Sequence, residues 1–148
     1  MNHLKVDLND PIFLRNLVIF PVKNGSEEIK FNPETIDNTI NQNKAVFSEL
    51  SVPDVTKIIF DNRGDSPVLM IDGEEITGSL QNRIIARSFI AEPHSRSQIP
   101  VICAEEKRWA EIGGFKTGYC SYPRVRSILA SSFGKKIDIQ HEVWKEIE

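Results

Sequence analysis

Short apolar runs alternate with turn residues through much of the chain. The runs are rich in β-branched and aromatic side chains, which favour strands, and they cover residues 17–22, 56–60, 68–71, 83–90 and 99–104. The segments between them combine Gly, Pro, Asn, Asp and Ser, a composition typical of turns, as at residues 62–67 and 93–97. Several short strands at this spacing predict a mainly β fold, either a two-layer sandwich or a distorted barrel.

Two of the runs carry more specific expectations. Residues 17–22 are apolar throughout and are predicted to form a buried strand, with Pro21 marking an edge or a bend at its end. Residues 68–71 are apolar on both faces, which predicts a central strand between two layers. The preceding residues 1–15 are expected to form an arm or an edge strand, and residues 45–50 an extended segment.

Helical signals are few and lie mostly near the C-terminus. Asn32 followed by Pro33 predicts the start of a short helix that ends near Gln42. Pro123 predicts the start of a second helix, which runs to residue 133, because Gly134 provides a stop. The glycine-rich residues 112–119, which lie between the strands and these helices, are expected to form a loop.

A last helix is expected after Asp138, which can cap it, with Ile139, Val143, Trp144 and Ile147 buried. This helix reaches Glu148 without a stop signal. We expect either that the chain is part of a longer one, or that this end packs on a partner such as a second copy of the chain.

The length and charge of the chain narrow the class of protein. A chain of 148 residues fits one domain, with a β core over residues 17–109 and a helical part over residues 122–148. The net charge of −3 argues against an extended nucleic-acid surface. No apolar run approaches the ~20 residues that span a bilayer, and the N-terminus lacks an apolar signal core, so a cytoplasmic protein is expected. Cys103 and Cys120 lack metal-site spacing and are expected to be small buried side chains.

The densest polar segment is DGEEITGSLQNR, residues 72–83, which directly follows an apolar run. It opens with the carboxylates of Asp72, Glu74 and Glu75. Two close carboxylates can bind a divalent cation, or they can act as a general acid and a base. The alternative is a solvated acidic turn between two strands, since exposed Asp and Glu are the norm.

The same segment ends in Gln81, Asn82 and Arg83. Amide groups offer paired donors and acceptors, and the Arg fork suits a phosphate or a carboxylate. The alternative is that Arg83 pairs with Glu74 or Glu75 across a hairpin and only fixes the fold.

A third polar cluster, residues 105–109, directly follows a predicted strand. Within it, Arg108 suits a phosphate and Trp109 suits a base or another ring, with Glu105 beside them. The alternative is a buried Trp109 with the Arg108 stem lying along it. No phosphate-binding loop, dinucleotide fingerprint or HExxH motif is present, so the residues specify neither a cofactor nor a metal.

Read together, DGEEITGSLQNR and IPVICAEEKRW resemble the ARG-and-Rhodanese-Phosphatase-superfamily-associated protein domain, a prokaryotic family without an assigned activity. The matching positions are Asp72, Gly73, Glu74, Gly78, Gln81, Asn82, Arg83, Cys103, Glu105, Arg108 and Trp109, and residues 140–144 match a further segment. The resemblance implies a link to ADP-ribose and nicotinamide-nucleotide processing, through association with ADP-ribosylglycohydrolase-type domains. Family members are longer, so the resemblance implies a truncated chain or a pocket completed by oligomerisation.

Two hypotheses follow from the sequence. The first is a site for a nucleotide-like or ADP-ribose-like ligand, with hydrolysis as an extension. Glu74 would be its catalytic acid or base, and its ligand-binding residues would be Asp72, Glu75, Gln81, Asn82, Arg83, Glu105, Arg108 and Trp109. The second is a non-enzymatic interaction or assembly module, in which the acid and Arg clusters form a structural salt-bridge network.

Overall fold

The computed structural model describes residues 4–6, 8, 10–24, 32–132 and 138–147. Contacts between residues divide the chain into two compact units, Met1–Phe31 and Asn32–Glu148. Each unit is described by itself. The polar segments singled out in the sequence all belong to the second unit.

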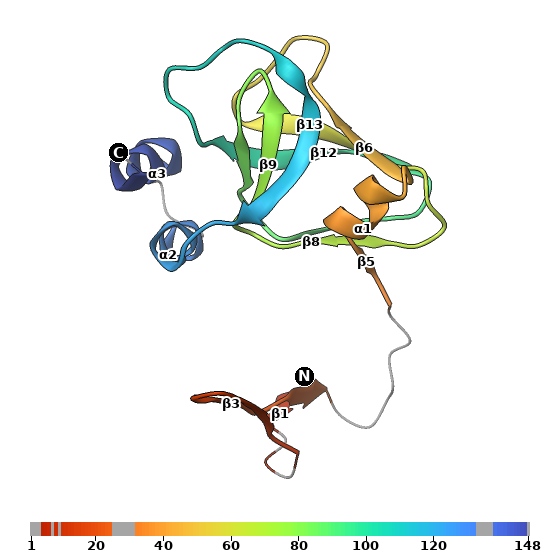
Figure 1. Cartoon of the computed structure of the whole chain (residues 1–148), viewed down its shortest axis with the longest axis vertical. Helices are drawn as coiled ribbons and strands as arrows, with labels where there is room; N and C mark the ends of the chain where they lie inside the picture. The colour runs from red at the N-terminus through yellow and green to blue at the C-terminus, as the bar shows by residue number, and fades with distance from the viewer. Residues whose placement is uncertain (1–3, 7, 9, 25–31, 133–137, 148) are drawn as a thin grey trace. The chain divides into compact units, whose positions relative to one another are not determined.

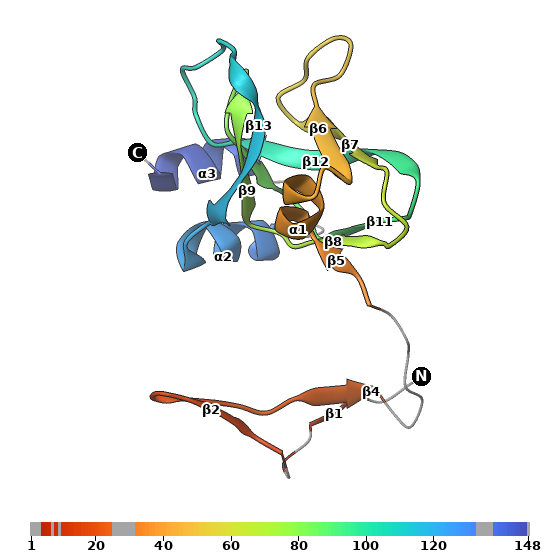
Figure 2. The same cartoon turned by 45° about the vertical axis from the view of Figure 1, so that its right-hand side comes forward.

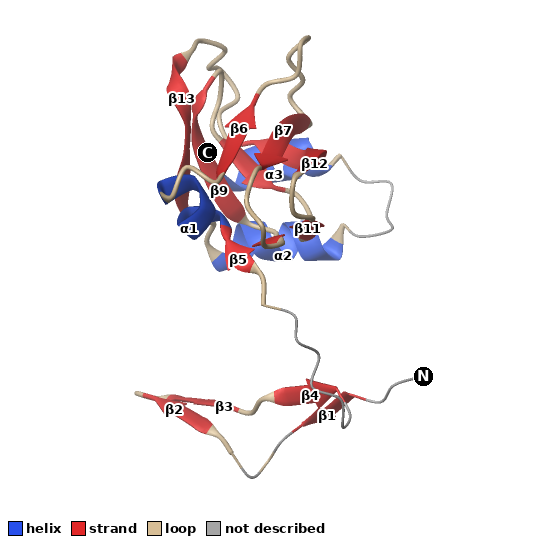
Figure 3. Ribbon diagram, turned by 90° about the vertical axis from the view of Figure 1, so that its right-hand side faces the viewer, coloured by secondary structure: helices blue, strands red, loops and turns tan. Residues whose placement is uncertain are grey.

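The first unit consists of two antiparallel strand pairs (Figure 3). Strand β1 (Leu4–Val6) pairs with β4 (Val22–Asn24), and β2 (Ile12–Leu14) pairs with β3 (Leu17–Ile19). The prediction of a buried strand over residues 17–22 is wrong, because the apolar side chains of β3 are exposed. A two-stranded ribbon has no second layer within the unit to cover it.

The second unit is built on a six-stranded antiparallel sheet that nearly closes into a barrel (Figure 1). Phe47 and Phe115, from the two edge strands, bring their ring centroids within 6.3 Å across the remaining gap. In spatial order the strands are β13 (Ile112–Cys120), β9 (Glu74–Ser79), β10 (Arg83–Ile85), β12 (Ser95–Cys103), β7 (Lys57–Asn62) and β6 (Ala45–Ser48).

A smaller sheet and a short helix lie beside this barrel. The sheet has β8 (Val68–Met70) at its centre, as the apolar run predicts, between β11 (Phe89–Ala91) and β5 (Glu34–Thr35). Helix α1 (Ile36–Asn41) contacts β6 and β13 of the barrel as well as β5 and β8 (Figure 2). The main apolar core draws on the barrel strands, on β8 and β11 of the smaller sheet and on α1. Its fully buried members include Ile58, Phe60, Val68, Met70, Ile76, Ile85 and Ile99.

Helices α2 (Pro123–Ser131) and α3 (Ile139–Ile147) form a second core with Ile84 of β10 and Ile102 of β12. Because side chains alternate along a strand, Ile84 faces the helices while its neighbour Ile85 faces the barrel core. Asp138 caps α3 as expected, since its Oδ1 accepts a hydrogen bond from the His141 N–H at 3.2 Å. The predicted fold class, a mainly β distorted barrel with helices mostly at the C-terminal end, is confirmed.

Three further local predictions are wrong, because contacts with distant parts of the chain outweigh the local sequence preference. The expected loop over residues 112–119 is strand β13, because pairing with β9 outweighs the low strand preference of its glycines. The expected single strand over residues 83–90 is divided between β10 and β11, which belong to different sheets. The first helix begins at Ile36 with Thr35 as its N-cap, rather than after Asn32.

The cysteines also differ from each other. Cys103 is buried as predicted, whereas Cys120 is exposed near the end of an edge strand, so the expectation of a buried side chain is wrong for Cys120. Both are free thiols.

Candidate functional site

Strand β9 separates the two halves of the polar segment. Glu74 opens the strand and Ser79 ends it, so at ~3.3 Å per residue the two ends lie about 17 Å apart. The carboxylates therefore gather at one end of β9, and Gln81, Asn82 and Arg83 follow the other end. The structure does not bring the acids and the Arg cluster into one cleft.

The carboxylate end opens into a hollow of about 300 Å³, which we call the acidic hollow. Glu74 and Glu75 of β9 line it together with Asp37 from the first turn of α1 and Arg126 from α2. The remaining lining residues are Ile36, Ile71, Thr117, Gly118, Tyr119 and Cys120. Sequence reasoning missed Asp37 and Arg126, because the residues around them carry no motif and only the fold brings them to β9.

Glu74 has the most perturbed environment in this hollow. Its Oε2 accepts a hydrogen bond from the Ile71 N–H at 2.6 Å. Burial raises the pKa of the Glu74 carboxyl and the negative charge of Asp37 adds to this, against the Ile71 hydrogen bond and the charge of Arg126. A carboxyl whose pKa is raised toward neutrality can hold a proton and donate it, which is the property of a general acid.

The raised pKa has a measurable consequence for stability. Because Glu74 binds its proton more tightly in the folded state, its contribution to stability is present below the unfolded pKa and is lost as the pH rises through the folded pKa. We expect Glu74→Gln, which stays neutral at every pH, to have a higher melting temperature than the wild type at pH 8, where Glu74 is ionised, and no gain at pH 4. The gain should be only about 1–3 °C, because solvent screens this partly exposed group. Thermal melts at both pH values measure the difference.

The matched control is Glu92→Gln, at an exposed carboxylate away from the hollow, which should change the melting temperature little at either pH. A gain of equal size at pH 4 and pH 8 for Glu74→Gln would show that proton binding by Glu74 is not the cause.

On the neighbouring strand β10, opposite Ile76 of β9, the Arg83 side chain is fully buried. Its guanidinium donates hydrogen bonds to Gln81 Oε1 and, at 3.2 Å, to the Asp54 carbonyl, and one nitrogen lies 3.5 Å from Glu49 Oε2. The Trp109 ring lies over it, with 5.7 Å from Cζ to the ring centroid. Arg83 Nε and Glu49 Oε2 have no hydrogen-bond partner within the part of the chain that the structure describes.

This environment corrects two structural alternatives drawn from the sequence, one for Arg83 and one for Trp109. Arg83 pairs with Glu49, which follows β6, and not with Glu74 or Glu75 across the hairpin; its register partner on β9 is Ile76. Trp109 is 49% exposed, so the alternative of a buried Trp is wrong. The guanidinium lies beneath the ring and away from solvent.

Arg108 ties the β9–β10 turn to the segment that follows β12. Its Nε donates to Glu105 Oε2 at 2.7 Å, and its terminal nitrogens donate to the Ser79 carbonyl at 2.8 Å and to Asn82 Oδ1 at 3.1 Å. Asn82 in turn donates its N–H to Glu105 Oε2 at 2.7 Å. Asn82, Glu105 and Arg108 line a hollow of about 290 Å³, but many of their polar groups hydrogen-bond to one another.

The pKa of Glu105 is consistent with a structural role for its hydrogen bonds to Arg108 and Asn82. Burial opposes its ionisation, but hydrogen bonds from Arg108 and from the Asn82 N–H, together with the Arg108 charge, outweigh burial and lower the pKa of Glu105. Gln81 also turns toward the protein, since its amide nitrogen donates to the Glu105 carbonyl at 3.2 Å. The contacts of the cluster around Arg108 therefore hold the β9–β10 turn against the segment that follows β12.

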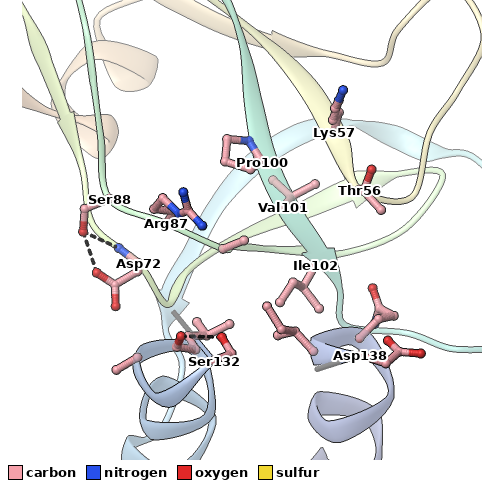
Figure 4. Close-up of a pocket in the computed structure, with 15 residues that line it drawn as sticks. Thr56, Lys57, Asp72, Arg87, Ser88, Pro100, Val101, Ile102, Ser132 and Asp138 are labelled. Atoms are coloured by element: carbon pink, nitrogen blue, oxygen red, sulfur yellow. Dashed lines mark hydrogen bonds between the residues drawn. The ribbon is translucent and has the colours of Figure 1, made fainter. Parts of the chain in front are cut away.

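Asp72 lies apart from both groups, at the edge of a larger cleft of about 810 Å³ (Figure 4). The Ser88 hydroxyl donates to Asp72 Oδ1, and the Asp72 N–H donates back to the Ser88 oxygen at 3.1 Å. Only Gly73 separates Asp72 from Glu74 in the sequence, so one tight turn serves two hollows. Gly73 has a φ of +92°, and a Cβ there would meet Arg126 Cγ at 2.7 Å.

Two further observations bear on chemistry. Among residues 4–6, 8, 10–24, 32–132 and 138–147, no three His, Cys, Asp or Glu side chains are arranged to hold a metal ion. None of the described helices is long and apolar enough to cross a membrane.

Fold and site together define a class: a barrel-like β domain with C-terminal helices, whose polar segment runs along one strand between separate hollows. The chain belongs to the ARG and Rhodanese-Phosphatase-superfamily-associated Protein domain family, whose model matches residues 5–148. No curated protein and no solved structure matches it.

Proposed function

We propose that the protein binds a small ligand carrying ribose and phosphate groups, of the nucleotide or ADP-ribose type, with the acidic hollow as the reacting end of its site. The observation that carries the proposal is Glu74, a partly buried carboxyl with a raised pKa, which lines a hollow beside a cation, Arg126. Perturbed carboxyls in hollows are enriched at functional sites.

The side chains of the hollow suit the two parts of such a ligand. Carboxylates such as Glu75 and Asp37 accept hydrogen bonds from ribose hydroxyls, and the Arg126 guanidinium can bind a phosphate through paired N–H donors. A volume of about 300 Å³ lies at the lower end of the range for ligand sites, so it suits a ribose phosphate rather than a whole dinucleotide.

Hydrolysis is the extension of this proposal. Water would add across the ligand's glycosidic or ester bond, with Glu74 protonating the leaving oxygen and regaining a proton from the attacking water. Incubation with ADP-ribose followed by chromatography detects the cleaved products. We expect Glu74→Gln to lose turnover by at least a hundredfold while still binding the ligand.

Thermal shift with ADP-ribose, NAD and divalent metal ions tests the binding. A ligand at a hundred times its Kd stabilises the folded state by about 2.7 kcal/mol, which raises the melting temperature by several degrees. We expect Arg126→Gln to weaken binding about tenfold or more, because a charge-assisted hydrogen bond is lost. Arg124→Gln, at an exposed arginine on the same helix but outside the hollow, is the matched control. If none of these ligands shifts the folded wild type, the proposal is wrong.

The second candidate function is the non-enzymatic interaction or assembly module. The enclosed contacts of Arg83 with Glu49, and of Arg108 with Glu105 and Asn82, favour it for the Arg end of β9, because these groups act on the fold itself. Light scattering separates the candidates: a monomer at micromolar concentration that binds ADP-ribose supports the ligand site over the assembly module.

A further inference from the structure

A further hollow of the second unit lies between the sheet and the C-terminal helices, outside the acidic hollow. Its walls come from the start of β7, the segment after β10, the C-terminal half of β12, and helices α2 and α3 (Figure 4). A volume of about 810 Å³ lies within the range of roughly 300–1,000 Å³ that small-molecule sites occupy. We call this hollow the helix–sheet cleft.

The cleft is preformed by contacts that fix helix α3 at one end of it. The Gln140 side-chain amide makes two hydrogen bonds to the backbone of Cys103. Its oxygen accepts from the Cys103 N–H at 2.8 Å, and its nitrogen donates to the Cys103 carbonyl at 2.8 Å. Trp144 Nε1 donates to the same carbonyl at 3.0 Å. Buried Val125 and Val143 pack the two helices against the sheet. A site held open in this way needs little reorganisation to accept a ligand.

The floor of the cleft is apolar. It is formed by residues beside and on the strands and from both helices, namely Ala86, Ile102, Leu129, Ala130 and Ile139, whereas Val101, which also lines the cleft, belongs to the barrel core. Two of them, Ile102 and Leu129, are themselves part of the second core, so the floor is continuous with packed protein rather than a surface patch. Such a floor favours a ligand with an apolar body.

Charged side chains stand around that floor with opposite signs in different places. Asp72 and Asp138 lie on opposite sides of the cleft, and Arg87 lies on the same side as Asp72 (Figure 4). Lys57 adds a second cation to the lining. The Arg guanidinium presents N–H donors in a fork that matches phosphate and carboxylate oxygens. An anionic group is therefore expected beside Arg87.

We propose that the helix–sheet cleft is a second ligand site, which takes a small molecule with an apolar body and one anionic group, held over the floor with its anion on Arg87. The site is independent of the function proposed for the acidic hollow, since the cleft lining shares no residue with that hollow. The apolar body contributes by burial, and the anion fixes the orientation.

Calorimetric titration of the full chain tests the proposal with 1-naphthyl phosphate, which has both parts. The comparison ligands are 1-naphthol, which lacks the anion, and inorganic phosphate, which lacks the apolar body. We expect 1-naphthyl phosphate to bind at least tenfold more tightly than either. Octyl phosphate distinguishes a ring from a chain as the preferred body, and tight binding of either ester supports the proposal.

Two variants assign the binding to the cleft. Arg87→Gln should weaken 1-naphthyl phosphate about tenfold or more and leave 1-naphthol unchanged. Ala130→Trp, at an exposed position of α2 that lines the cleft, should fill it and abolish binding of the ester. Arg96→Gln, at an exposed arginine of β12 that does not line the cleft, is the control.

Failure of 1-naphthyl phosphate to bind the folded wild type at millimolar concentration would overturn the proposal. So would an affinity for it that neither Arg87→Gln nor a folded Ala130→Trp changes. If Ala130→Trp does not fold, as circular dichroism would show, Arg87→Gln alone decides.

Discussion

Arg83→Ala is expected to lower the free energy of unfolding by about 3–5 kcal/mol, the range found when one partner of a buried ion pair is removed. The side chain is fully buried, and its loss leaves the Glu49 carboxylate, which is 15% exposed, without its cation. Alanine also removes packing beneath the Trp109 ring. Urea unfolding followed by Trp fluorescence measures the change.

A double variant separates the loss of the pair from the loss of volume. Arg83→Met with Glu49→Gln keeps most of the volume and buries no charge, so it should be clearly more stable than Arg83→Ala. Arg63→Ala is the matched control, because Arg63 pairs with Asp61 at 2.9 Å on the surface, and exposed pairs contribute about 0–1 kcal/mol. If Arg83→Ala is no more destabilising than Arg63→Ala, Arg83 does not stabilise the barrel and a ligand-binding role for it gains support.

Gly78→Ala should be comparably severe, with a loss of about 3–5 kcal/mol. Gly78 has a φ of +101°, which L side chains rarely adopt and which carries a strain of about 1–3 kcal/mol. A Cβ there would also lie 2.4 Å from the Gly114 carbonyl oxygen of β13, a backbone atom that cannot rotate away. The added methyl group would push β9 and β13 apart, at one margin of the nearly closed sheet.

The partner glycine provides a close control. A Cβ on Gly114 would meet nothing within 4 Å, so Gly114→Ala should change stability by well under 1 kcal/mol, although the two residues face each other. Chemical unfolding of both variants gives the comparison. Equal stability of Gly78→Ala and Gly114→Ala would contradict the close approach of the two strands.

Much of the fold was accessible from local patterns. Residues 68–70 of the predicted run 68–71 form β8, the central strand of the smaller sheet, while Ile71 lies outside it and is exposed. Pro123 opens helix α2 and Asp138 caps α3, because in these cases the local preference and the packing agree. Strand β13 was not accessible, since Gly113, Gly114 and Gly118 disfavour a strand and only the partner β9 makes them one.

The candidate site was accessible only in part. Glu74 does line a hollow, as its position after an apolar run suggested, but Arg83 does not line it and is buried against Glu49 and Trp109. The chain folds back after β9, so Arg83 pairs with Ile76, but its guanidinium contacts Glu49 and Trp109, neither of which lines the acidic hollow. Asp37 and Arg126 line the same hollow as Glu74 but come from two helices, and no motif or spacing in the sequence indicates that they lie together.

The hydrogen bonds between Gln140 and the Cys103 backbone have a consequence for the edge that strand β12 would otherwise present. Strand β12 is in register with β7 from Ser95 to Pro100, and the Val101 N–H still donates to the Thr56 carbonyl at 2.9 Å, but the β7 register does not reach Cys103. At Cys103 a side-chain amide offers the donor and acceptor that another strand would offer. Uncovered strand backbone is a template for pairing with other chains, which leads to aggregation. Helix α3 thus covers this part of the β12 edge, and a chain without the helix would expose unpaired strand backbone that can pair with another chain.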